Sequence, residues 1–181
     1  MTESTTPGAT SRLADGTAAG SWVLDPAGST AEFRVGHFWG ATSVRGTLGL
    51  IAGEAAVSPD GTVTGQISFD AQSLSTGHKQ RDKHLRSADF FHTGEHPAAV
   101  LTVTSARPAG PDGLTCQATL EVAGHPRPVT FTAHIQDADA QAVVLTAELE
   151  VDRGEFGMTW RPLHMASMTA MGTVQARFTR A

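Results

Sequence analysis

Apolar and polar residues alternate with a period of two along most of the chain from Trp22 onward. The stretch at residues 62–69 is an example, since Val63, Ile67 and Phe69 fall on one face and polar side chains on the other. Successive side chains of a β-strand point to opposite faces, so the alternation predicts strands with one buried face. The same pattern recurs at residues 30–35, 44–51, 99–105, 114–122, 129–135, 143–151 and 173–179. It predicts about eight strands in all.

Short turn signals separate these predicted strands. Proline, glycine or aspartate gathers at residues 59–61, 108–113, 124–126 and 137–140, as is typical of tight connections. Eight strands with one apolar face each can close on themselves, which removes both sheet edges. We therefore predict an all-β fold, an eight-stranded antiparallel barrel that can enclose one ligand. A two-layer sandwich is the alternative that the pattern leaves open.

Residues 69–97 depart from the strand pattern. A turn rich in serine, threonine and glycine leads into a charged run with helical spacing, which ends at Phe90, Phe91 and Pro97. Side chains four residues apart lie on one face of a helix, so the run predicts one short inserted helix over about residues 77–87. A polar run followed by two aromatic residues is expected where a solvated surface meets a buried one.

Length and composition favour one folded domain at residues 21–181. The first 20 residues are rich in serine, threonine, glycine and alanine, and we expect them to form a disordered tail. The net charge of −5 argues against nucleic acid as a partner. The N-terminus carries no basic and apolar signal sequence, and no apolar run is long enough for a transmembrane helix. We therefore expect a soluble, cytoplasmic protein.

Several motifs occur in a fixed order along the chain. They are Trp22-x-Leu24-Asp25-Pro26 with Ser29, Phe33, Val35 and His37; Val44-x-Gly46; Ser73-x-x-Thr76-Gly77; Arg81-Asp82-x-His84-Leu85-Arg86-Ser87-Ala88-Asp89-Phe90-Phe91 with Pro97; Pro128-Val129; and Arg153-x-x-Phe156-Gly157. Through this set the chain resembles the YceI-like proteins, also called polyisoprenoid-binding proteins, over nearly all of residues 22–181.

The resemblance implies a lipocalin-like, extended barrel with a helix beside it and a long apolar cavity. It implies non-enzymatic binding, sequestration or transport of a long-chain amphiphile, such as an isoprenoid quinone or a polyprenyl phosphate. Family members are often dimers, so a homodimer is expected. Two features depart from the family pattern. The chain lacks the signal peptide of many members, and residues 161–171 differ from the glycine-rich, acidic stretch expected before the last strand.

Inward positions of the predicted strands, together with aromatic residues near their ends, are candidates for contact with the ligand tail. Polar residues at the rim would meet its head, because arginine can grip a phosphate or carboxylate with two hydrogen bonds. Arg81 and Asp82 also have a structural interpretation, in which they tie the helix to the barrel. The predicted ligand-binding residues are Phe33, Val35, His37, Ile67, Phe69, Arg81, His84, Phe90, Phe91, Leu101, Phe131, Phe156, Met158, Trp160 and Met168.

No motif in the chain predicts a cofactor, a metal or a catalytic residue. His92 and His96 are four apart, but the glycine between them disfavours a helix that would align them, and neither HExxH nor HxH occurs. GxSxG and phosphate-binding loops are also missing from the sequence, and the single cysteine, Cys116, falls on an inward face as an inert thiol. Two alternatives remain, an enzyme acting on a hydrophobic substrate in the same cavity and a plugged structural or stress-response module.

Overall fold

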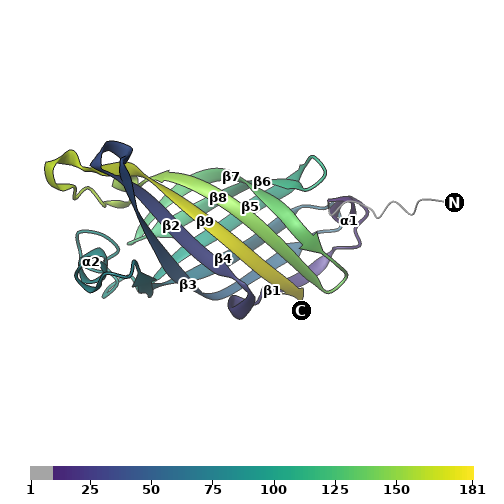
Figure 1. Ribbon diagram of the computed structural model, residues 1–181. Helices are drawn as coiled ribbons and strands as arrows, with labels where there is room; N and C mark the ends of the chain where they lie inside the picture. Colours follow the sequence, from purple (N-terminus) through teal and green to yellow (C-terminus); the bar gives the residue numbers. More distant parts are fainter. Residues whose placement is uncertain (1–9) are drawn as a thin grey trace.

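Nine antiparallel strands form one continuous sheet in the computed structural model, which describes residues 10–181 (Figure 1). The strand order is β1-β3-β2-β9-β8-β7-β6-β5-β4, and a further pairing of β3 with β4 closes the sheet. The strands are β1 (Gly20–Leu24), β2 (Thr30–His37), β3 (Thr42–Val57), β4 (Val63–Ser75), β5 (Ala98–Ala109), β6 (Gly113–Val122), β7 (His125–Ala138), β8 (Ala142–Asp152) and β9 (Ala166–Arg180).

β1 and β2 share one position in the barrel. Both strands pair with β3 on one side and with β9 on the other. The short 3₁₀ helix η1 (Pro26–Gly28) separates them, because the proline nitrogen cannot donate to a strand ladder. The Asp25 carboxylate accepts the Gly28 N–H and lies 2.8 Å from Nη1 of Arg177 on β9. The barrel therefore has eight strand positions, which confirms the predicted barrel and excludes the sandwich.

The two ends of the barrel carry different structures (Figure 1). At one end lie helix α2 (Lys79–Leu85) and the loops that contain the 3₁₀ helices η2 (Phe38–Gly40), η3 (Arg153–Phe156) and η4 (Pro162–His164). We call this end the mouth. α2 falls inside the predicted range of 77–87, and Nδ1 of His78 caps it by accepting the Arg81 N–H. At the opposite end lies the one-turn helix α1 (Ser11–Ala14).

The segment before β1 is folded against the end opposite the mouth. Leu13 is only 6% exposed and packs with Leu114 and Ile135. The indole Nε1 of Trp22 donates to the carbonyl of Ala18 at 3.0 Å. Side chains within residues 10–20 are thus packed, where the composition predicted a disordered tail, because apolar side chains in this polar segment cover the apolar end of the barrel. Residues 1–9 lie outside the described part of the chain.

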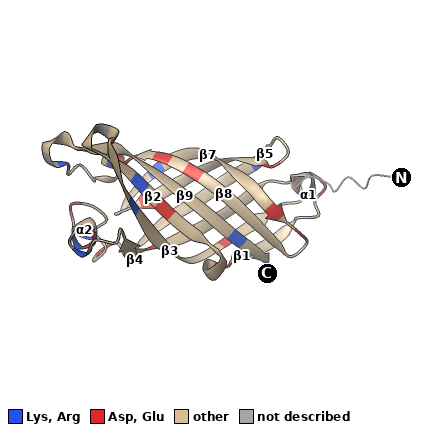
Figure 2. Cartoon of the chain, in the orientation of Figure 1, with Lys and Arg blue, Asp and Glu red and all other residues tan. Residues whose placement is uncertain are grey.

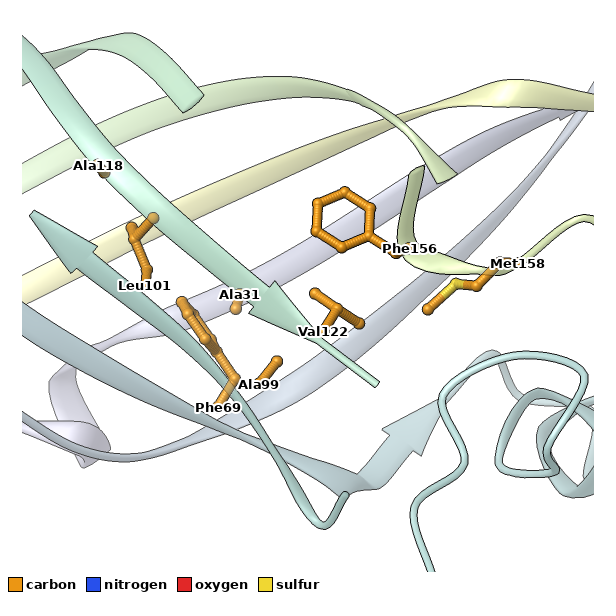
Figure 3. Close-up of a cluster of buried hydrophobic side chains, with 8 residues drawn as sticks. All are labelled: Ala31, Phe69, Ala99, Leu101, Ala118, Val122, Phe156 and Met158. Carbon is orange, nitrogen blue, oxygen red and sulfur yellow. The ribbon is translucent and has the colours of Figure 1, made fainter. Parts of the chain in front are cut away.

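Buried apolar side chains line the inside of the barrel along its length. Figure 3 shows the group nearer the mouth, which η3 and the residues after it complete with Phe156 and Met158. Two further groups surround Leu13 and Trp22 toward the opposite end. Figure 2 shows that most of the strand length carries neither acidic nor basic residues, whereas α2 is densely charged. The charged side chains of α2 thus lie next to the apolar inner wall of the barrel, at the mouth.

Candidate functional site

A cavity of about 370 Å³ lies inside the barrel. Inward positions of β2 to β9 form its wall, with contributions from α2, η3 and the adjoining loops. Many of these inward residues are small, including Ala99, Ala133, Ala147, Ala170 and Gly172. Short side chains cannot fill the centre of an eight-stranded barrel, so the alternation of strand residues leaves open space in place of a packed core.

Every predicted ligand-binding residue except Met168 lines this cavity. Apolar members come from β2, β4, β5 and β7, and aromatic members come from the loops at the mouth. That these residues contact a ligand stays a prediction. The cavity-lining members of the predicted set are Phe33, Val35, His37, Ile67, Phe69, Arg81, His84, Phe90, Phe91, Leu101, Phe131, Phe156, Met158 and Trp160.

Met168 is the one member of the predicted set that does not line the cavity. The β2–β9 ladder is irregular between Val35 and His37, which is the part of β2 opposite Met168. The terminal Cε of Met168 lies so close to Gly154 that a methyl group there would be 2.7 Å from it. Met168 thus packs on η3, and its neighbours Ala166 and Ala170 on β9 line the cavity.

An aromatic cluster stands at the mouth. The ring of His84 lies 4.5 Å from that of Trp160 and 5.2 Å from that of Phe90, both edge to face. Phe90 and Trp160 are 5.8 Å apart. Nε2 of His84 also lies 2.9 Å from a carboxylate oxygen of Asp89. This bond, with the edge-to-face contacts, fixes the imidazole at the boundary between cavity and solvent.

Arg153, the first residue of η3, is a buried cation on the cavity wall. Arg153 is only 6% exposed. Its Nε donates to the carbonyl of Ser167 at 2.8 Å, and its Nη2 donates to the carbonyl of Trp160 at 3.1 Å. Within residues 10–181, its guanidinium pairs with no carboxylate. Burial lowers the pKa of Arg153. Because a guanidinium has five N–H groups, Arg153 has donors to spare beside the cavity.

α2 is clasped to the barrel through Thr76. The Asp82 carboxylate accepts the Thr76 hydroxyl and, at 2.8 Å, its N–H. Arg81 donates from Nε to the Thr76 hydroxyl oxygen and from Nη2 to the Thr76 carbonyl. These bonds support the structural interpretation of both residues, although Arg81 also borders the cavity. The hydroxyl of Thr76, more than any other group, holds the pKa of Asp82 below its ordinary value of 3.8.

The barrel, its mouth helix and the order of the motifs agree with one family. The family profile described as the YceI-like domain matches residues 22–179. The chain belongs to the YceI-like family. No helix within residues 10–181 is long and apolar enough to cross a membrane.

Curated relatives of this YceI-like chain match parts of it. A UPF0312 protein from Shewanella denitrificans is 35% identical over 122 residues, which cover 64% of this chain and 62% of that protein. Protein YceI from Escherichia coli is 41% identical over 69 residues, covering 38% of this chain and 36% of that protein. The chain thus spans less than two thirds of the length of these relatives.

Solved structures share the YceI-like fold at low sequence identity. BcnA from Burkholderia cenocepacia superposes with a TM-score of 0.77 at 16% identity, covering 85% of this chain and 98% of that one. A polyisoprenoid binding domain from Saccharophagus degradans gives a TM-score of 0.71 at 18% identity, covering 88% and 98%. These likenesses concern the fold.

Arg153 is the site residue that sequence reasoning missed. Its motif, Arg153-x-x-Phe156-Gly157, supports the YceI-like resemblance, but the predicted ligand-binding set does not include the arginine. The available signal was an arginine just after an alternating strand, in the same motif as Phe156, which belongs to the predicted ligand-binding set. Alternation ends at Asp152, however, so the period cannot say which way the next side chain points.

The clasp at Thr76 predicts a pH-dependent contribution to stability. Asp82→Asn should lower the free energy of unfolding by about 1 kcal/mol at pH 7, because a charged hydrogen bond becomes a neutral one. The pKa of Asp82 is lower in the folded state, so its stabilisation is present above pH 3.8 and is lost as the pH falls further, through the folded-state pKa. Urea unfolding at a series of pH values measures this difference.

The control for this experiment is Asp112→Asn, at an exposed aspartate in the β5–β6 turn. Its free energy of unfolding should match the parent protein at every pH. A difference between Asp82→Asn and parent that stays constant from pH 7 to pH 3 would contradict the role assigned to Asp82.

Proposed function

We propose that this YceI-like protein binds a long-chain amphiphile and carries or sequesters it, with the tail enclosed in the barrel cavity. The proposed ligand class is an isoprenoid of the quinone or polyprenyl phosphate type. One observation carries the proposal, a long apolar cavity with polar side chains at its mouth. Its volume of about 370 Å³ falls within the usual range of small-molecule sites. A cavity of this size also argues against the plugged module.

The length of the cavity favours a chain over a compact ring system. Ala166 and Phe178 both line it and stand twelve residues apart on β9. At about 3.3 Å per residue and a strand tilt of about 40°, this separation corresponds to about 30 Å along the barrel axis. A modest volume spread over that length describes a narrow tube. Removal of apolar tail surface from water would supply about 25 cal/mol per Å².

The distribution of polar groups gives the proposed ligand an orientation. His37, Arg81, His84 and Arg153 all belong to elements at the mouth, whereas Glu54 and other polar residues farther along the wall have exposed side chains. The head of an amphiphile would therefore sit at the mouth, with the tail pointing toward α1. The Saccharophagus structure, which shares this fold, is that of a polyisoprenoid binding domain. This likeness supports the proposed ligand class.

Filling the tube should weaken binding. Ala147 faces the cavity on β8, and Ala147→Phe places a ring across the tube. We expect the affinity for a C20 prenyl alcohol to fall at least about tenfold, because the tail would lose its buried position. Native mass spectrometry of the protein titrated with geranylgeraniol measures bound ligand directly.

The matched control is Glu148→Phe, which adds a phenyl ring at the next residue, on the exposed outer face of β8. It should bind geranylgeraniol like the parent protein, and circular dichroism should show both variants folded. If Ala147→Phe binds as well as Glu148→Phe, the cavity is not the binding site. If the parent protein takes up no prenyl compound and carries no lipid through purification, the proposed function is wrong.

Arg153 should contribute affinity for an acidic head. Farnesyl phosphate and farnesol share a tail and differ in the head, so the ratio of their affinities isolates that group. The parent protein should prefer the phosphate by about tenfold or more, since a hydrogen bond to a charged group contributes about 1.5–3 kcal/mol. Arg153→Met should remove the preference. Unchanged farnesol binding by the variant shows an intact fold, and a preference that survives would contradict the role.

Cys116 offers an independent test of occupancy. It is the only cysteine in the chain, lines the cavity, and burial raises the pKa of its thiol. A bound tail should slow alkylation by N-ethylmaleimide at least about tenfold, because a buried thiol reacts only where the reagent can reach it. Mass spectrometry follows the reaction with and without geranylgeraniol, and urea-unfolded protein should react equally in both. Equal rates in folded protein would place the ligand elsewhere.

A further inference from the structure

A second group of ligating side chains lies outside the cavity, on the loop between α2 and β5. His92, Glu95 and His96 each bring one nitrogen or oxygen into a group whose members all lie within 4.8 Å of one another. Within residues 10–181, no other three histidine, cysteine, aspartate or glutamate side chains come so close. The lipid-binding function gives this group no role.

A single turn brings the three side chains together. The N–H groups of Glu95 and His96 both donate to the carbonyl of His92, at 3.0 Å and 2.9 Å. His92 itself has a left-handed backbone (φ 48°), and the turn that follows it places the three side chains on one side of the loop. The glycine was expected to disfavour a helix that would align the histidines, and residues 92–96 form no helix. A single turn is nevertheless sufficient to bring the two histidines together.

The turn is held in place by bonds to its surroundings. Thr93 is 6% exposed, and both its N–H and its hydroxyl donate to the carbonyl of Arg86. The His92 N–H donates to Ser87, and the Pro97 carbonyl accepts the N–H of Ala71 on β4. A backbone anchored on both flanks loses little freedom when a ligand binds, which lowers the cost of binding.

The imidazole of His96 is also positioned by a neighbouring strand connection. It lies against Gly124, in the turn between β6 and β7, so closely that a methyl group there would be 2.6 Å from its Cε1. The rings of His92 and His96 are 5.7 Å apart at their centroids. Nε2 of His92 is 3.8 Å from the nearer oxygen of Glu95. Ligands of a tetrahedral zinc ion lie about 3.3 Å apart, given bond lengths near 2.0–2.2 Å.

We propose that His92, Glu95 and His96 form a binding site for one divalent transition-metal ion of the zinc class. Small side-chain rotations convert the observed distances into those of a coordination sphere. Two imidazoles and a carboxylate suit zinc and its neighbours, whereas magnesium and calcium prefer oxygen ligands alone. Three protein ligands leave a fourth position for water. The site is separate from the cavity, so it stands or falls independently of lipid binding.

The test uses the full chain without a polyhistidine tag. Isothermal titration with Zn²⁺ should give one ion per chain with a dissociation constant in the micromolar range, and Co²⁺ should give visible absorption bands of nitrogen and oxygen ligation. His92→Gln and His96→Gln should each weaken Zn²⁺ binding at least about tenfold, with Glu95→Gln intermediate. The matched control is His134→Gln, an exposed histidine on β7, which should bind like the parent.

Either of two results overturns the proposal. One is the lack of saturable Zn²⁺ binding by the parent chain below about 1 mM, a concentration that corresponds to about −4 kcal/mol of binding free energy. The other is equal affinity in the parent, His92→Gln and His96→Gln proteins. Thermal unfolding without metal should give the same midpoint for all variants, so a loss of affinity reflects lost ligands and not a lost fold.

Discussion

The pairing of β3 with β4 is the constraint on which the structure depends. Its register runs from Thr47 opposite Ser75 to Val57 opposite Val63 and joins the last edge of the sheet to the first. Once closed, the sheet has no exposed edge, and every second residue of every strand must face a shared interior. Access to that interior is confined to the two ends. The mouth elements and the N-terminal segment occupy those ends, so the position of the site follows from closure.

A closed sheet does not by itself make a cavity. Large inward side chains would meet at the axis of an eight-stranded barrel and form a packed core. Here, bulky rings such as Phe33 and Phe69 share the wall with alanines and with Gly172. Gly46, paired with Phe33 across β2 and β3, leaves the ring room to lie flat against the wall. The mixture of aromatic and small side chains on its wall keeps the cavity both apolar and open.

The sequence allowed the strands and their inward faces to be predicted, because a half-buried strand must alternate. The prediction failed for side chains whose direction depends on more than the two-residue alternation of a strand. Met168 packs on η3 beside an irregularity in the β2–β9 ladder, although Ala166 and Ala170 on the same strand line the cavity. Leu13 is a lone leucine in a polar segment, and only the apolar barrel end explains its burial. Arg153 follows the last alternating residue. The turn at His92 depends on hydrogen bonds to β4 and to the residues just after α2, which local propensity does not encode.

The N-terminal segment gives the tube a floor. Leu13 and Trp22 cover the end opposite the mouth, above a small void of about 140 Å³ that shares Leu114 and Phe178 with the main cavity. A floor at that end would limit the length of the tail that the cavity can enclose. Tails of the proposed amphiphile no longer than the cavity would leave their heads at Arg153, whereas longer tails would hold their heads in solvent. Such a ligand would enter the mouth tail first and leave it head first, because the floor lies at the other end of the barrel.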